Sequence, residues 1–205
     1  MEQNLDENRA VLTGVALSEP HFSHKTYGES FYMMDLGVTR KSGYTDRVTL
    51  MISEKLLWHC CPEEGDLLNI SGQIRTYNQP VDGRNHLVIV VFVKSMEQVD
   101  INEPMENYIL LEGYICKEPV RRTSPLGREL CDIMLAVNRM FNKSDYIPCI
   151  AWGRNAIFGG ELPVGTKILI EGRLQSRQYR KYDENGIPEE KTAYEVSVTR
   201  MDEVE

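Results

Sequence analysis

The chain has 205 residues, 41% of them hydrophobic and 26% charged, which indicates an ordinary globular protein. Its net charge of −8 argues against a uniformly basic surface of the kind that coats nucleic acid. No apolar stretch approaches the roughly 18 residues of a membrane span, and residues 1–7 lack the features of an export signal, so we expect a cytoplasmic protein.

The first hundred residues carry short apolar stretches typical of strands. A single helix-like segment, residues 53–61, is expected between the third and fourth strands, with Ser53 as its N-cap. Pro80-Val81-Asp82-Gly83 predicts a turn between the last two strands. The five expected strands are 11–17, 31–38, 48–52, 67–74 and 87–93.

The remaining residues repeat this order of elements. A short helix is expected at 154–158, and Asp183-Glu184-Asn185-Gly186 predicts the last turn. The linker 99–104 is too short to let the two halves move far apart, so we expect them to pack against each other. The five expected strands are 109–115, 130–137, 147–152, 167–174 and 192–198.

The two halves are copies of one sequence. Residues 7–14 return as 106–113, at an offset of 99 that becomes 100 after one inserted residue, so that 65–72 matches 165–172. A period this long exceeds the 20 to 50 residues of solenoid repeats and indicates domain duplication. We therefore expect two domains, 1–100 (the first copy) and 101–205 (the second copy).

The order of elements in each copy predicts an all-β fold. Five strands with a short helix between the third and fourth are the order of the OB-fold, a five-stranded Greek-key barrel whose members commonly bind oligonucleotides. An SH3-like or other small barrel has nearly the same pattern in one sequence. The leading expectation is two tandem OB-folds.

Positive charge is concentrated locally. The first copy holds 9 Lys and Arg against 14 Asp and Glu, and the second holds 14 against 17, so neither is basic as a whole. Four cations nevertheless fall within nine residues of the second copy, at Arg173, Arg177, Arg180 and Lys181. A basic face on an acidic body is consistent with this distribution.

Three segments of the second copy form a recognisable pattern: Asn107 to Gly113, Tyr146 to Ala156, and above all Gly165-Thr166-Lys167-Ile168-Leu169-Ile170-Glu171-Gly172-Arg173-Leu174 followed by Tyr179. On these segments, residues 107–200 resemble the bacterial single-stranded DNA-binding protein (SSB) family. In that family aromatic side chains stack on unpaired bases and basic side chains follow the phosphates. The resemblance therefore implies binding of single-stranded DNA in replication, recombination or repair.

Positions matched to the family supply the candidate site. The stacking candidates are Phe141, Tyr146, Trp152 and Tyr179, and strand alternation places Tyr146, Pro148, Ile150 and Trp152 on one face. The phosphate candidates are Arg139, Arg154, Arg173, Arg177, Arg180 and Lys181. Taken alone, an aromatic side chain on a small barrel is as readily explained by the core, and a single arginine by the solvated surface.

The first copy departs from the family at these positions. Ser42, Arg47, Ser53 and Gln79 stand where the second copy has Phe141, Tyr146, Trp152 and Tyr179. We expect the first copy to act mainly as scaffold or weak second site, and Trp58 to lie in its core. Other aromatic and basic side chains there do not follow the family pattern: Tyr32, Tyr44, Tyr77, Arg40, Lys41, Arg47 and Arg75.

Signals for metal binding or catalysis are weak. His21-x-x-His24 and His59-Cys60-Cys61 lack a second supporting pair, and the odd number of cysteines, five, fits free thiols. No phosphate-binding, nucleophile or zinc-protease motif occurs. We therefore expect no metal, no cofactor and no enzymatic activity.

The resemblance also bears on the oligomeric state, on the C-terminal segment and on the alternative functions. Relatives usually gather four OB-folds, so a homodimer is expected. The acidic end, residues 201–205, lacks the polar linker and apolar tip through which family members recruit other proteins. A protein-interaction module that has lost strand binding is the alternative function, and binding of RNA is a further possibility because stacking does not read the sugar.

Overall fold

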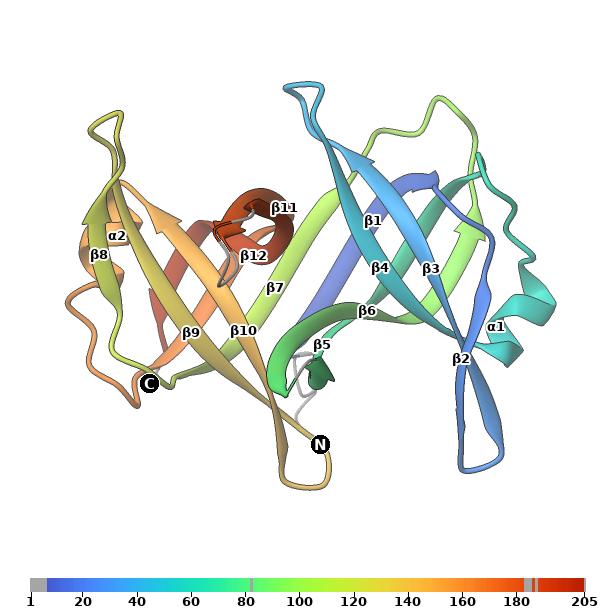
Figure 1. Cartoon of the computed structure of the whole chain (residues 1–205), viewed down its shortest axis with the longest axis horizontal. Coiled ribbons are helices and arrows are strands. Elements are labelled where there is room, and N and C mark those ends of the chain that lie inside the picture. Colours follow the sequence, from blue (N-terminus) through green and yellow to red (C-terminus); the bar gives the residue numbers. More distant parts are fainter. Residues whose placement is uncertain (1–6, 82, 183–185, 187, 205) are drawn as a thin grey trace.

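Two β-barrels lie side by side in the computed structural model, which describes residues 7–81, 83–182, 186 and 188–204 (Figure 1). The first copy contains β1 (Asn8–Ala16), β2 (His21–Thr26), β3 (Glu29–Thr39), β4 (Thr45–Ser53), α1 (Glu54–His59), β5 (Leu67–Val81) and β6 (Arg84–Gln98). The second contains β7 (Asn107–Ile115), β8 (Val120–Thr123), β9 (Glu129–Arg139), β10 (Lys143–Trp152), α2 (Arg154–Gly159), β11 (Lys167–Tyr182) and β12 (Pro188–Glu203).

Strand pairing closes each barrel in the same way. In the first copy β1 pairs with β3 and β5, β3 with β4, and β5 with β6, all antiparallel, while β4 and β6 pair in parallel. The second copy repeats these pairings with β7, β9, β10, β11 and β12. The alternating apolar residues of these strands fill the interiors. The predicted tandem OB-fold is confirmed.

The structure contains two short strands that the apolar pattern did not predict. β2 and β8 lie at the two ends of the sheet and pair only with β3 and β9. Neither strand buries a residue, so neither has the alternation that reveals a half-buried strand. The hairpin strands β5, β6, β11 and β12 also extend well past their predicted ends, because their outer parts are polar.

Helix α1 corrects one expectation from the sequence. Trp58 was predicted to lie in the core, but 71% of its surface is exposed. Leu56 and Leu57 pack on the core and occupy the inward side of this six-residue helix, so Trp58 points to solvent. Ser53 holds the N-cap position but makes no side-chain capping bond. Among the described residues, neither helix is long and apolar enough to cross a membrane.

The two barrels share one continuous sheet. β1 pairs antiparallel with β7, and Ala10 lies opposite its own counterpart Ile109, with Asn8 opposite Leu111 and Leu12 opposite Asn107. This register places a pseudo-two-fold axis through the Ala10–Ile109 pair. The resulting twelve-stranded sheet encloses one apolar cluster with members from both copies.

Two equivalent aspartates fasten each copy to a hairpin strand of the other. Asp46 is fully buried and accepts bonds from Ser176 N at 2.7 Å and Arg40 at 2.6 Å. Its counterpart Asp145 is also fully buried and accepts a bond from Thr76 N at 2.7 Å. Arg75 and Arg139 pair with Asp145 at 3.0 and 3.4 Å. We call these two groups the aspartate clamps.

Asp145→Asn is expected to destabilise the fold by about 2 to 3 kcal/mol. It leaves Arg75 and Arg139 without their buried carboxylate, and their partial exposure keeps the cost somewhat below that of breaking a fully buried pair. Denaturant unfolding measures the change. Asp132→Asn is the matched control, because its pair with Arg122 is about half exposed and should contribute at most about 1 kcal/mol. Equal effects would contradict a structural role for the clamps.

Candidate functional site

The outer face of the second barrel carries two of the predicted aromatic residues. On β10, Tyr146 is half exposed and Trp152 is 39% exposed, and Pro148 lies between them on the same side. Ile150 shares this face by alternation but is only 5% exposed. Met134 of β9 lies opposite Pro148 and extends the apolar strip between the two aromatic rings.

The β11–β12 hairpin carries the third aromatic residue together with cations. Arg173, Arg177 and Tyr179 alternate along one face of β11, and all three are exposed. The Arg177 guanidinium lies 5.8 Å from the centroid of the Tyr179 ring. This stacking gives the aromatic plane a positive partner. Arg173 makes no ion pair within the described part of the chain and is exposed.

Glu195 introduces a negative charge into this arrangement. It lies on β12 opposite Gln175, and its carboxylate is 4.0 Å from Arg177 Nε. Burial raises the pKa of Glu195, and the nearby Asp132 raises it further, whereas Arg177, Arg122 and Arg40 lower it. The side chain is thus a partly buried carboxylate among arginines, at a place where Arg177 would otherwise attract an external anion.

A groove connects these residues. One section is lined by side chains of both copies, including Tyr77, Leu87, Lys117, Met134 and Tyr146. The adjoining section contains Leu87 and Met134 again, together with Pro148, Tyr179 and Glu195. Because Leu87 and Met134 line both sections, the groove is continuous from the beginning of β10 to the β11–β12 hairpin.

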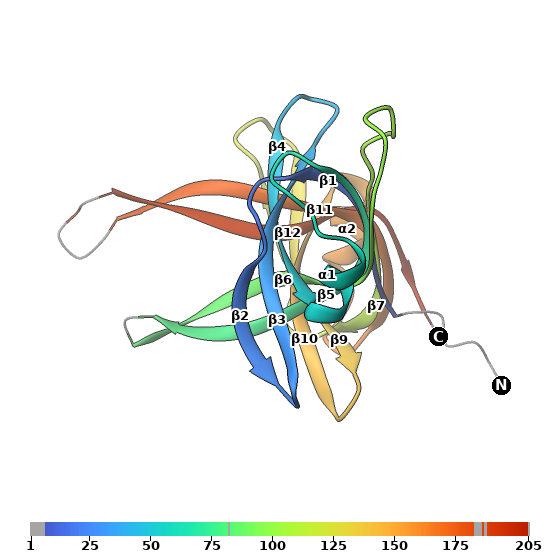
Figure 2. The same cartoon turned by 90° about the vertical axis from the view of Figure 1, so that its right-hand side faces the viewer.

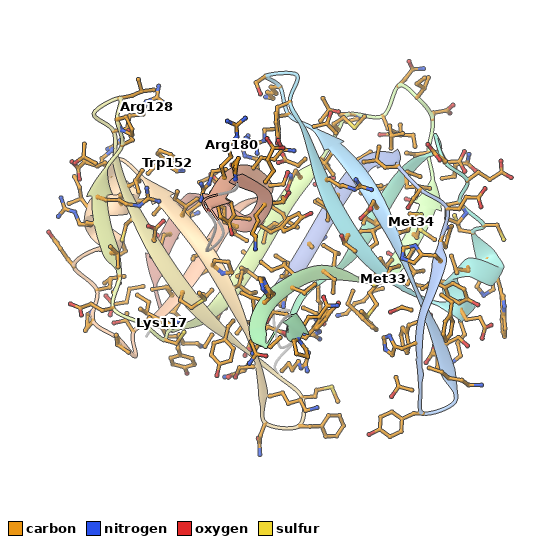
Figure 3. The ribbon with its side chains drawn as sticks, viewed as in Figure 1. Met33, Met34, Lys117, Arg128, Trp152 and Arg180 are labelled. Atoms are coloured by element: carbon orange, nitrogen blue, oxygen red, sulfur yellow. The ribbon has the colours of Figure 1, made fainter. Side chains whose placement is uncertain are left out.

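Figure 2 shows how this groove is bordered. The β5–β6 and β11–β12 hairpins project to the same side of the two barrels, one from each copy. In the view of Figure 3, Trp152 lies between the hairpin of β8 and β9, which carries Arg128, and the β11–β12 hairpin, which carries Arg180. Trp152, at the end of β10, is exposed, and the two hairpins on either side of it in this view carry basic side chains.

Three further predicted residues lie at the margins. Phe141 is exposed in the turn between β9 and β10, where its φ of 66° is unusual for a bulky residue. Arg154 is exposed at the first position of α2. Arg180 pairs with Glu190 at 3.5 Å in a largely exposed contact that contributes little stability. The side chain of Lys181, like the turn residues Asp82 and 183–185, lies outside the described residues.

Arg139 has a different surrounding from the other phosphate candidates. Its guanidinium is 3.4 Å from the fully buried carboxylate of Asp145, within an aspartate clamp. It remains part of the proposed site only through the portion of its side chain that stays exposed. Its equivalent in the first copy, Arg40, binds Asp46 in the same way.

Three of the basic residues noted in the first copy are bound to carboxylates. Arg47, in the place of Tyr146, pairs with Asp35 at 2.7 Å. Arg40 and Arg75 are held by the clamps. Ser42 and Gln79 are exposed polar residues, and Ser53 begins α1. The first copy also has three aromatic residues that do not follow the family pattern. Tyr77 lines the groove, the Arg40 guanidinium lies over the ring of Tyr44, and Tyr32 contacts Phe22 edge to face.

Several groove residues were absent from the sequence-based site. Met134 was detectable, because strand alternation places it on the outer face of β9. Leu87, His86 and Glu195 were not, since nothing in the sequence shows that the hairpins of both copies meet over one groove. No group of three His, Cys, Asp or Glu side chains suited to a metal occurs among the residues that the structure describes, and the five cysteines are free thiols.

Comparison with known proteins identifies the second copy's relatives. The model of the "Single-strand binding protein family" matches residues 106–204. Single-stranded DNA-binding protein 1 of Staphylococcus aureus is 35% identical over 86 residues, or 38% of this chain and 52% of that protein. Single-stranded DNA-binding protein A of Bacillus subtilis is 35% identical over 82 residues, or 37% and 48%. The chain thus spans about half the length of the curated relatives it matches.

A solved structure resembles the whole chain. The wild-type single-stranded DNA binding protein from Thermus aquaticus superposes with a TM-score of 0.77 at 19% sequence identity, covering 97% of this chain and 93% of that one. Identity this low supports the fold alone. The likeness over both copies nevertheless agrees with the tandem arrangement of OB-folds.

Proposed function

Since residues 106–204 belong to the single-strand binding protein family, we propose that this chain binds single-stranded DNA along the groove of its second copy. The observation that carries the proposal is the open face of β10. There Tyr146 and Trp152 are exposed large aromatic residues on a barrel of this family. Tyr146 and Tyr179 line the groove, and Arg177 lies beside the Tyr179 ring. Exposed aromatic rings beside exposed arginines are what unstacked bases and phosphates require.

The mechanism combines two physical effects. Each base that stacks on an aromatic ring contributes roughly 1 to 3 kcal/mol regardless of its identity. Arginines that meet phosphates release the counterions condensed on the strand, so affinity falls as salt increases. The phosphate positions are proposed at Arg154, Arg173, Arg177, Arg180 and Lys181, with Arg139 beside them, and the stacking positions at Phe141, Tyr146, Trp152 and Tyr179.

The wider role follows from the family. Its members are binding proteins, and we propose that this chain likewise has no catalytic activity and acts in replication, recombination or repair within the cytoplasm. We also propose a homodimer, which would present four OB-folds. Sedimentation measures the oligomeric state, and competition between oligo-dT and oligo-rU measures whether RNA is bound as well.

The two copies are proposed as domains with bounds 1–100 and 101–205. The support is that β6 ends at Gln98 and β7 begins at Asn107, so the connection between the barrels contains the boundary. Proteolysis that first cuts within residues 99–106 agrees with these bounds. First cuts inside a barrel strand disagree with them.

A second candidate function is a protein-interaction module on the OB scaffold. The first copy favours it, because three of its arginines are held by carboxylates and Trp58 is exposed on α1. A stable protein complex together with no response to any oligonucleotide supports this alternative. Binding of oligo-dT that requires the β10 aromatic residues rejects it as the main function.

Trp152→Ala and Tyr179→Ala are each expected to weaken oligo-dT binding by about 1 to 3 kcal/mol, through loss of one stacked base. Fluorescence anisotropy at two salt concentrations measures affinity and its salt dependence. Trp58→Ala is the control, because that side chain is similarly large and exposed but lies on α1 of the other copy. If wild-type protein shows no affinity at low salt, or if all three variants bind equally, the proposal fails.

Glu195→Gln is expected to strengthen oligo-dT binding by about 1 kcal/mol at neutral pH, the size of one charge interaction near 4 Å in water. The substitution removes the carboxylate that faces Arg177. Burial raises the pKa of Glu195, so the wild-type carboxylate becomes neutral as pH falls through that raised value. The advantage of the variant should therefore shrink at acidic pH. An advantage that is absent, or constant with pH, contradicts this role.

A further inference from the structure

The β5–β6 hairpin of the first copy lies directly against the aromatic strand of the second. Tyr146 N donates a hydrogen bond to Thr76 Oγ1 at 2.9 Å, and Thr76 N donates to Asp145 Oδ1 at 2.7 Å. These bonds join β5 to the beginning of β10. Tyr77 follows Thr76 directly. The ring of Tyr77 is therefore held close to the exposed side chain of Tyr146, and both line the same groove section.

The groove is built from both copies along its length. Tyr77, Asn78 and Leu87 line one section opposite Lys117, Met134 and Tyr146. His86, Leu87 and Ile89 line the next section, which Pro148 and Tyr179 also border. In Figure 1 the β5–β6 ribbon likewise curves from the first barrel to the lower end of β10. One wall of the groove thus comes from the copy that lacks the family's aromatic pattern.

A comparison of the two hairpins shows that the first retains a usable ring. The outer face of β11 carries Arg173, Gln175, Arg177 and Tyr179, and the equivalent face of β5 carries Gln73, Arg75, Tyr77 and Gln79. The aromatic residue has moved two positions toward the barrel. Because strand side chains alternate with period 2, this shift keeps the ring on the same face.

The exposed fractions of Tyr77 and Leu87 show whether these side chains pack in the joint between the copies or stay open to a ligand. Tyr77 is 39% exposed and Leu87 is 40% exposed, so both leave apolar surface open to the groove instead of closing it. The bonds that fix the hairpin are made by the neighbouring Thr76, which is buried. Tyr77 and Leu87 are therefore not needed to close the joint between the copies.

We propose that Tyr77 and Leu87 of the first copy contact the bases of the same strand that stacks on Tyr146 and Tyr179 of the second, so that the two copies form one composite binding groove. The inference rests on the proposed function. A base has two apolar faces, and a groove with rings or aliphatic side chains on opposite walls covers both of them. Lys117, which lines the section with Tyr77, supplies a positive charge for the phosphates.

The test uses full-length Tyr77→Ala, Leu87→Ala and the double variant with oligo-dT. The double variant is expected to bind roughly tenfold more weakly, the order of one lost base contact. Tyr77→Phe should restore the affinity lost in Tyr77→Ala, because it keeps the ring. Trp58→Ala again serves as the control for removing an exposed ring from the first copy. Denaturant midpoints verify that all variants remain folded.

Ultraviolet cross-linking of oligo-dT to the unmodified protein gives a second measurement that needs no variant. Cross-linked peptides are expected from residues 75–88 as well as from β10 and β11. Cross-links confined to the second copy, with full affinity in the double variant, overturn the composite groove. That outcome differs from failure of the proposed function, in which wild-type protein does not bind or the Trp152→Ala and Tyr179→Ala variants lose nothing.

Discussion

The pairing of β1 with β7 determines where everything else in the molecule lies. This antiparallel contact converts two equivalent barrels into one sheet and relates them by a pseudo-two-fold axis at Ala10 and Ile109. Because a two-fold contact uses the same surface on both partners, each feature at the joint occurs twice. Asn8 and Asn107 each bind the backbone of a residue in their own copy, Ile74 and Leu174, by two hydrogen bonds.

The aspartate clamps carry this symmetry from the sheet to the hairpins. A buried carboxylate is tolerated only when it is paired and hydrogen-bonded, and Asp46 and Asp145 meet this condition with donors from both copies. Each clamp holds a hairpin strand of the opposite copy, and the two hairpins project to the same side of the barrels (Figure 2). The groove therefore exists only because the two copies are joined. Its lining contains residues of both copies, so the sequence of one copy does not reveal it.

The sequence predicted those parts of the molecule that depend on local pattern. Alternating apolar residues located the ten barrel strands, and the repeat identified equivalent positions such as Gly72 and Gly172, where the backbone of the next strand passes too close for a side chain. The sequence failed where no local pattern exists. β2 and β8 bury nothing, Trp58 follows two leucines yet turns outward, and Leu87 meets Met134 only through tertiary structure.

The distribution of cations explains how an acidic chain can present a site for a polyanion. Arg40, Arg75 and Arg47 of the first copy are bound to carboxylates and contribute structure, whereas among the described residues Arg173 makes no ion pair and Arg177 meets Glu195 only at 4.0 Å. Arginines of both copies, Arg40, Arg75 and Arg139, thus stabilise the joint, while Arg173 and Arg177 on the outer face of β11 stay exposed. If a strand lies in the groove as proposed, the net charge of −8 opposes its binding elsewhere, because the chain as a whole presents no uniform positive field.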